Sequence, residues 1–236
     1  MTERFGFKTL INEDEVFGLC VFPVGSNNFD EFSNEQTALT PKQTHSLNVG
    51  IVEYPWETFE DTDALVTFRE DCPIGVCTAD CVPILLYAPD IKGAAAVHAG
   101  WRGSLGGIVD NTLDILEKRG ADLGKLTVAF GPSISAAKYE VDQNLADKFI
   151  EAGFSDCVTY PDGNDRKPHI DLQGVNIERL IRRGVIKENI KPSDECTFDS
   201  ILENGVSKYQ SYRRDGDKAG RMVTAIGMHP GMHQRH

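Results

Sequence analysis

Residues 78–103 read TADCVPILLYAPDIKGAAAVHAGWRG, and this stretch decides the fold. It contains two short apolar runs, Val82 to Tyr87 and Gly93 to Val97, with Pro89-Asp90 in the connection between them. Apolar runs bounded by turn residues are typical of buried strands joined in a β-hairpin. The stretch therefore predicts an antiparallel pair at the centre of the molecule.

Cys81 and His98 are predicted to be neighbours across this hairpin. With the turn centred near Asp90, the numbers of facing residues sum to about 180, and 81 + 98 = 179. The pair then has two chemical interpretations: an imidazole that activates a thiol nucleophile, or two ligands of a transition metal. The competing structural interpretation is a small buried cysteine beside a core histidine.

Composition and charge argue against several classes of partner. The 236 residues include 24 Lys and Arg against 36 Asp and Glu, and the net charge of −12 argues against binding of nucleic acid or anionic membranes. No segment suits a signal peptide or reaches the ~20 apolar residues of a membrane span. We therefore expect a cytoplasmic protein whose six cysteines are free thiols or metal ligands.

The rest of the chain alternates between strand and helix patterns. Strand-like runs are expected at 16–23, 49–52, 61–67, 74–78 and 126–130. Helices are expected from near Arg102 to Gly120, from Asp142 to Gly153 and from Asp171 to Gly184. Later runs at 208–216 and 220–228 suggest a strand, a polar turn and a second strand, while 27–36 suggest a polar loop or short helix. We predict a single α/β domain over residues 1–228, followed by a disordered tail over 229–236.

A catalytic zinc usually has three protein ligands, so Cys81 and His98 would need a third. His45 and His169 are the only other histidines before the C-terminal tail. His45 is the better candidate because it precedes a strand and sheet ends bring loops together, but spacing alone does not choose between the two.

Three arginines are candidates for binding an anion. Arg102 stands where a helix is expected to begin, and free N–H groups there favour a phosphate or carboxylate. An exposed arginine at a helix end is the alternative interpretation. Arg213 and Arg214 are adjacent, and on a strand they would point to opposite faces, so at most one is expected to reach the site.

The motifs resemble those of the laccase-domain family, also called the polyphenol oxidase or YfiH-type family. The matching pieces follow the family order over nearly the whole chain: QTH (43–45), DALVT (63–67), TADCVP (78–83), VHAGWRG (97–103), GPSI (131–134), YEV (139–141), DL (171–172) with Asn176, CT (196–197), and SYRRDG (211–216) with GR (220–221). The pieces HAGWRG and TADC together are highly specific.

The resemblance implies one domain with α/β/β/α layering of mixed sheets and a metal site on His45, Cys81 and His98. It implies zinc, with copper as the alternative. Purine nucleosides and phosphate are the implied partners, through phosphorolysis of adenosine, inosine and methylthioadenosine and deamination of adenosine. The residues expected to be catalytic are Cys81, His98, Asp80 as acid or base, and Arg102. Those expected to contact the substrate are Gln43, Asn176, Arg213 and Arg214.

One departure from the family pattern bears on the metal. Many members have cysteines between the GPSI and YEV pieces, where this chain has Ser135-Ala136-Ala137-Lys138. This difference counts against a multicopper oxidase. Three other functions stay open: a copper-dependent phenol oxidase, a Cys-His hydrolase or peptidoglycan-precursor editing factor, and a non-catalytic metal-binding partner protein. The oligomeric state and the preferred nucleoside also stay open.

Overall fold

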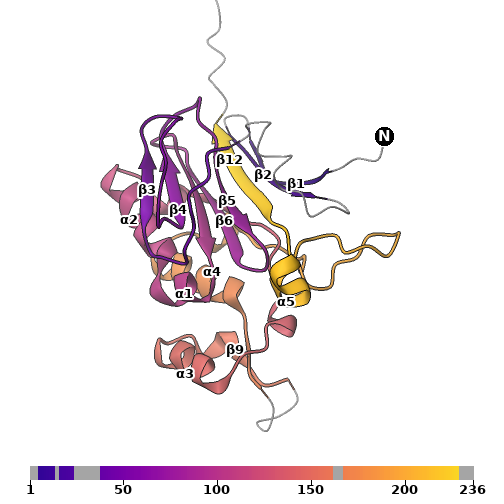
Figure 1. The fold of residues 1–236 in the computed structure, drawn as a ribbon. Helices are drawn as coiled ribbons and strands as arrows, with labels where there is room; N and C mark the ends of the chain where they lie inside the picture. Colours follow the sequence, from indigo (N-terminus) through magenta and orange to yellow (C-terminus); the bar gives the residue numbers. More distant parts are fainter. Residues whose placement is uncertain (1–4, 14–15, 24–37, 162–166, 229–236) are drawn as a thin grey trace, which may run out of the picture.

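The computed structural model describes residues 5–13, 16–23, 38–161 and 167–228 (Figure 1). A four-stranded antiparallel sheet has the order β1-β2-β12-β5, formed by Phe5–Glu13, Val16–Pro23, Met222–Met228 and Ile74–Thr78. A six-stranded mixed sheet has the order β11-β8-β6-β7-β4-β3, formed by Ile190–Lys191, Thr127–Phe130, Val82–Ala88, Gly93–Ala99, Ala64–Thr67 and Val49–Val52. A small third sheet pairs β9 with β10, at Val158–Thr159 and His169–Ile170.

The predicted hairpin is formed by β6 and β7, but its register differs from the prediction. Val82 pairs with Ala99 and Pro83 with His98, so facing numbers sum to 181. The reason is that Ile91 and Lys92 also belong to the turn, and Lys92 has a left-handed φ of 46°. A shift of two residues leaves every side chain on its expected face. His98 and Cys81 are therefore diagonal neighbours rather than a facing pair.

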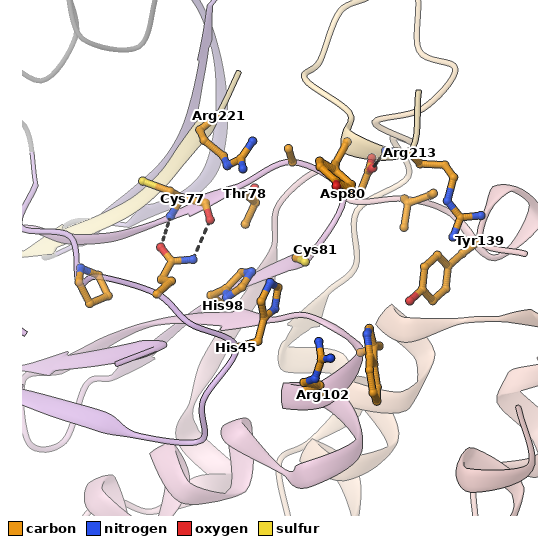
Figure 2. Close-up of a pocket in the computed structure, with 16 residues that line it drawn as sticks. His45, Cys77, Thr78, Asp80, Cys81, His98, Arg102, Tyr139, Arg213 and Arg221 are labelled. Atoms are coloured by element: carbon orange, nitrogen blue, oxygen red, sulfur yellow. Dashed lines mark hydrogen bonds between the residues drawn. The ribbon is translucent and has the colours of Figure 1, made fainter. Parts of the chain in front are cut away.

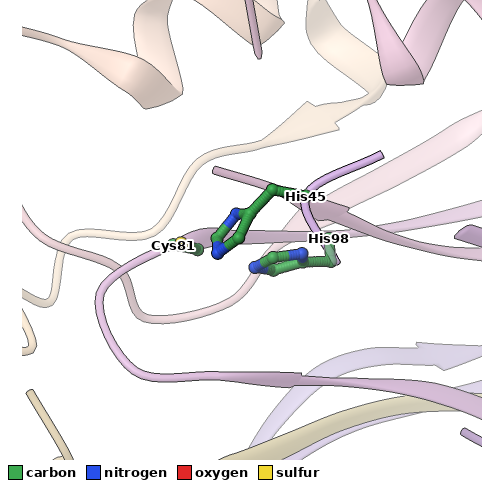
Figure 3. Close-up of side chains that lie close together, drawn as sticks. All are labelled: His45, Cys81 and His98. Carbon is green, nitrogen blue, oxygen red and sulfur yellow. The ribbon is translucent and has the colours of Figure 1, made fainter. Parts of the chain in front are cut away.

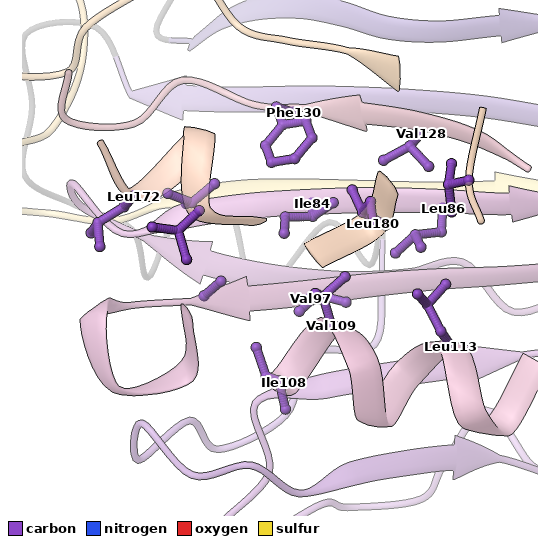
Figure 4. Close-up of a cluster of buried hydrophobic side chains, with 14 of the residues drawn as sticks. Ile84, Leu86, Val97, Ile108, Val109, Leu113, Val128, Phe130, Leu172 and Leu180 are labelled. Atoms are coloured by element: carbon purple, nitrogen blue, oxygen red, sulfur yellow. The ribbon is translucent and has the colours of Figure 1, made fainter. Parts of the chain in front are cut away.

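Both faces of this hairpin are buried. Ile84 and Leu86 belong to a cluster under the helices, whereas Leu85 and Tyr87 point into a second cluster between the two large sheets. Figure 4 shows the first cluster, in which Val97 and Phe130 meet side chains from the helices. A strand that is apolar on both faces reads as a continuous hydrophobic run, which is why this stretch dominates the sequence pattern.

The α-helices are α1, α2, α3, α4 and α5, at Trp101–Gly106, Ile108–Lys118, Gln143–Glu151, Leu172–Arg182 and Tyr212–Asp215. The predicted single helix from Arg102 to Gly120 is wrong, because Gly107 adopts a left-handed φ of 86° and separates α1 from α2. Arg179 of α4 donates to the carbonyls of Ser104 and Leu105 at this break. The predicted third helix is confirmed, with Asp171 as its N-cap accepting from Gly174 N–H.

The prediction of a strand over 208–216 is also wrong. Ser211 accepts a hydrogen bond from the Arg214 N–H and so caps the short helix α5, while the following strand, β12, is confirmed. The segment 27–36 and the predicted tail 229–236 lie outside the described residues.

The mixed α/β class with packed mixed sheets is confirmed. Helices α1 and α2 pack against β7, and α4 packs on both of them, so these helices cover the outer face of the six-stranded sheet. The four-stranded sheet lies against its other face (Figure 1). None of the described helices has the length and apolar character needed to cross a bilayer. The layers leave the ends of β5, β6 and β7 open on one side, where the candidate site lies.

Candidate functional site

A cavity of about 580 Å³ opens where the β5–β6 turn meets the start of α1. Figure 2 shows its lining, which comes from segments far apart in the sequence. His45, Cys81 and His98 lie on one side of it, and Tyr139 and Arg213 lie on the other. The volume is within the range of small-molecule sites.

The structure brings His45, Cys81 and His98 together, as Figure 3 shows. One nitrogen from each histidine and the Cys81 Sγ lie within 4.8 Å of one another. His98 is buried, Cys81 is half-buried and His45 is exposed. His45 comes from the loop before β3, Cys81 from the residue before β6, and His98 from the end of β7. His169 instead lies on β10, where its Nδ1 is 2.8 Å from the Ala136 carbonyl oxygen.

Gly100 lies against two of these residues, His45 and Cys81. A Cβ at this position would lie 2.7 Å from His45 Nδ1 and 3.1 Å from Cys81 Sγ. Real Cβ atoms do not approach neighbours as closely as the first of these distances, so only glycine lets the imidazole and the thiol converge here. Two imidazoles and one thiol around a shared open position fit zinc, and they also suit copper.

Asp63 is fully buried behind the two histidines and was not among the residues predicted to form the site. Its Oδ1 is 2.6 Å from His98 Nδ1 and accepts from His45 N–H at 3.0 Å. Its Oδ2 accepts from Thr44 N–H at 3.1 Å, and from Ser46 N–H at 2.7 Å and Oγ at 2.9 Å. Burial alone would raise the pKa of Asp63, but these hydrogen bonds outweigh it and lower the pKa to about 2.

The two histidines have opposite charge preferences. Burial alone would lower the pKa of His98, but hydrogen bonds with Asp63 and Cys81 outweigh it and raise the pKa to about 9. Burial and the positive charge of His98 lower the pKa of His45. Because a carboxylate only accepts, His98 must donate from Nδ1, which leaves Nε2 for Cys81 or a metal.

Asp80, predicted as an acid or base, lies on the cavity wall with both carboxylate oxygens engaged. Oδ1 accepts from Thr197 Oγ1 at 2.6 Å, and Oδ2 accepts from Arg213 N–H at 2.6 Å. Its own backbone has a left-handed φ of 86°. Asp80 thus joins the turn before β6 to the segment at Thr197 and to helix α5.

The arginines divide into two groups. Arg102 stacks 4.3 Å from the Trp101 ring and Arg213 stacks 5.2 Å from the Tyr139 ring, and both line the cavity. Arg214 does not line it: its guanidinium donates to the carbonyls of Thr197, Phe198 and Tyr209 and pairs with Asp215. Only one of the two adjacent arginines therefore faces the site, but a helical turn rather than a strand separates them.

Gln43 and Asn176 occupy different places. Gln43 lines the cavity, but its amide is held by Cys77, with Nε2 2.8 Å from the carbonyl oxygen and Oε1 2.7 Å from the backbone nitrogen (Figure 2). Asn176 is fully buried on α4 and is not among the residues lining the cavity. Its Nδ2 donates to Ser104 Oγ and the Leu172 carbonyl, so it connects α4 to α1.

A family model described as multi-copper polyphenol oxidoreductase laccase matches residues 27–229. The chain belongs to this family. It is similar to a protein named adenosine deaminase RL5 from an unknown prokaryotic organism, with 34% identity over 79% of this chain and 73% of that protein. It is also similar to a purine nucleoside phosphorylase of Deinococcus radiodurans, with 33% identity over 79% of this chain and 68% of the relative.

Solved structures of the family share the fold. The YfiH protein of Bacillus licheniformis superposes with a TM-score of 0.78 at 22% identity, over 90% of this chain and 92% of that one. A DUF152 protein of Neisseria meningitidis superposes with a TM-score of 0.76 at 25% identity, over 95% of this chain and 99% of that one. The laccase-like recognition made from the motifs is therefore confirmed.

Sequence reasoning missed several residues that complete the site in this family member. Asp63, Arg221 and Tyr139 were all within recognised motifs, but nothing in their spacing assigned them a role. Burial raises the pKa of Tyr139 to about 12, so its phenol stays protonated and can donate into the cavity. Thr78 also lines the cavity, and its buried hydroxyl has no partner among the described residues.

Proposed function

We propose that this protein is a metal-dependent purine nucleoside enzyme. It would catalyse phosphorolysis of adenosine, inosine and methylthioadenosine, and deamination of adenosine. The observation that carries the proposal is the convergence of His45, Cys81 and His98 at one side of an arginine-lined cavity. The names of the similar proteins, adenosine deaminase and purine nucleoside phosphorylase, support both reactions. We further propose that the enzyme acts in the cytoplasm on small molecules and binds no nucleic acid or membrane.

His45, Cys81 and His98 would hold the metal through one imidazole nitrogen each and the thiolate sulfur. We propose zinc, with copper as the alternative that the same donor atoms allow. When bound, such an ion supplies Lewis acidity toward a substrate oxygen or a water molecule.

Arg102 and Arg221 are proposed to hold phosphate. Both line the cavity, both are exposed, and both are close enough to His45 to lower its pKa. Two guanidinium groups suit a phosphate because each donates hydrogen bonds from a planar fork. Phosphorolysis needs the phosphate beside the anomeric carbon as positive charge develops on the ribose, and these two side chains would fix it there.

The opposite end of the cavity suits the purine. Trp101 and Tyr139 provide aromatic faces, and Arg213 lies over the Tyr139 ring. An aromatic ring stacks on a purine, while a protonated phenol and the unpartnered Thr78 hydroxyl can donate to its ring nitrogens or exocyclic group. Gln43 and Asp80 would then hold the segments that line the cavity in place through their hydrogen bonds, and would not take part in the reaction.

The direct test is product analysis with purified metal-replete protein. Adenosine or inosine is incubated with and without phosphate, and nucleosides, free bases and ribose 1-phosphate are separated. We expect adenine or hypoxanthine only when phosphate is present, and inosine from adenosine without it. Absence of both free base and inosine under all conditions would reject the proposal.

A phenol oxidase is the second candidate, because the family description names it and because two histidines and a cysteine suit copper. Oxygen uptake with a phenolic substrate after copper loading separates this candidate from the first. A Cys-His hydrolase is a third, supported by the hydrogen bond between His98 and Cys81. It predicts that Cys81 is alkylated stoichiometrically even in metal-replete enzyme.

A further inference from the structure

We propose that Asp63 is the positioning residue that sets both histidines of the metal site at once. The inference rests on the proposed metal site but concerns a residue that none of the motifs had assigned to it. Asp63 touches neither the cavity nor the substrate, because its side chain is fully buried behind the histidines. Its carboxylate instead connects the backbone of His45 to the ring of His98 through a single oxygen.

Oδ1 makes this connection. It accepts from the His45 backbone N–H at 3.0 Å and contacts His98 Nδ1 at 2.6 Å. Both groups are donors, so a single oxygen fixes where the His45 backbone starts and how the His98 ring is rotated. With its proton on Nδ1, His98 presents an unprotonated Nε2 to a metal.

Oδ2 holds the rest of the loop. It accepts from Thr44 and Ser46, so three successive backbone N–H groups turn toward one carboxylate. That turn places His45 at a left-handed φ of 64°, a conformation that non-glycine residues seldom adopt unless the surroundings hold them. The carboxylate therefore stabilises the conformation that aims the His45 ring at Cys81.

An asparagine at this position cannot do the same. Its amide nitrogen is a donor and would face one or more of the five donors that surround the carboxylate. The neutral His98 ring is then more stable with its proton on Nε2, because Nδ1 can accept a hydrogen bond from the asparagine amide. That tautomer places a proton on the nitrogen needed for the metal.

Asp61→Asn is the matched control. Asp61 is an exposed carboxylate two residues earlier, with a left-handed φ of 44°, and its side chain contacts the same loop through Thr44 Oγ1 and Asn48 Nδ2. Within the described part of the chain its side chain contacts neither histidine ring, and asparagine tolerates left-handed backbone. The two variants therefore separate loop anchoring in general from the orientation of His98.

The experiment measures zinc affinity by competition with a chelator. It also measures the tautomer of the neutral His98 ring by nitrogen NMR, in the metal-free protein at a pH high enough to deprotonate the imidazolium. For Asp63→Asn we expect affinity to fall about 10–100-fold and the Nε2–H tautomer to appear. Asp61→Asn should change zinc affinity less than about 3-fold and leave the His98 proton on Nδ1, because substitutions at exposed polar contacts usually have small effects. Ser46→Ala, which removes one donor to Oδ2, provides a milder test should Asp63→Asn fail to fold, with an expected loss of about 2–10-fold.

The outcomes are distinct. Equal affinity of Asp63→Asn and the wild type, or equal losses in the two aspartate variants, would overturn the positioning role while leaving the metal site intact. An Nε2–H tautomer of the neutral His98 ring in the metal-free wild type would also overturn it, and this measurement needs no variant. Failure of the wild type to bind zinc or copper at all would reject the proposed function together with the inference.

Discussion

Two parts of the cavity are built in opposite ways. In the metal site, His98 and Asp63 are buried, and Asp63 accepts hydrogen bonds from the His45 backbone and the His98 ring. Next to this site, Arg102 and Arg221 are exposed; among the described residues Arg102 stacks on Trp101, and Arg221 donates to the carbonyls of its neighbours Ala219 and Gly220. The contrast indicates that one side is organised before any ligand arrives and that the other takes its final shape around one.

The largest expected effect comes from breaking the organised side directly. Cys81→Ala removes one of the three donors, so we expect loss of stoichiometric metal and a fall in nucleoside turnover beyond the ~100-fold typical of an outer partner. Metal analysis and product formation check this. Cys196→Ser is the control, since that thiol is also half-buried but lies outside the cavity. Retention of one metal per chain in Cys81→Ala would contradict the ligand assignment.

The pH dependence of the metal-free protein tests the same side. A pKa raised from 6.5 to about 9 means that His98 contributes stability fully below pH 6.5, and that this contribution is lost as the pH rises through 9. The shift corresponds to about 3 kcal/mol. Urea denaturation with a chelator present should therefore show falling stability over this window. His98→Asn should flatten the curve, and an unchanged slope in that variant would assign the loss to other groups.

The two adjacent arginines differ in how firmly they are held: Arg214 donates to three backbone carbonyls, whereas Arg213 donates to the Glu140 carbonyl alone, at an exposed position. Arg214→Met leaves the carbonyls of Thr197, Phe198 and Tyr209 without their donor, so we expect a loss of about 2–3 kcal/mol of unfolding free energy. Arg213→Met should change stability by less than about 0.5 kcal/mol but raise KM for the nucleoside. Denaturation curves and steady-state kinetics separate the two. Equal destabilisation by both variants would contradict the assignment of Arg214 to a structural role and Arg213 to the cavity.

The smallest expected effect concerns the two exposed arginines beside the metal site. Arg102→Met and Arg221→Met each remove one charged donor for phosphate, so KM for phosphate should rise about 10-fold in each. The rate of adenosine deamination, a reaction that uses no phosphate, should fall by a smaller factor. Arg119→Met carries the same charge change, but Arg119 stacks on Phe68 away from the cavity, so it controls for net charge. An unchanged KM for phosphate in both cavity variants would remove these arginines from the phosphate site.

The sequence predicted the core of the fold because β6 and β7 are apolar on both faces. The same pattern placed Cys81 near His98, although the predicted register differed from the observed one by two residues. Because side chains alternate between faces with a period of two, this shift kept both side chains on the same face. Asp63 was missed because its role depends on a loop 17–19 residues earlier in the chain folding back against it. Arg213 was placed on a strand because the capping role of Ser211 was overlooked, although serine is a common N-cap.

The central claim is that one metal ion binds to His45, Cys81 and His98. X-ray absorption spectroscopy of the zinc-loaded protein tests it most directly, because sulfur and nitrogen neighbours scatter differently. We predict one sulfur at ~2.3 Å and two imidazole nitrogens at ~2.0–2.1 Å, with the sulfur absent in Cys81→Ala. A zinc environment of oxygen and nitrogen alone in the wild type would show that Cys81 is not a ligand.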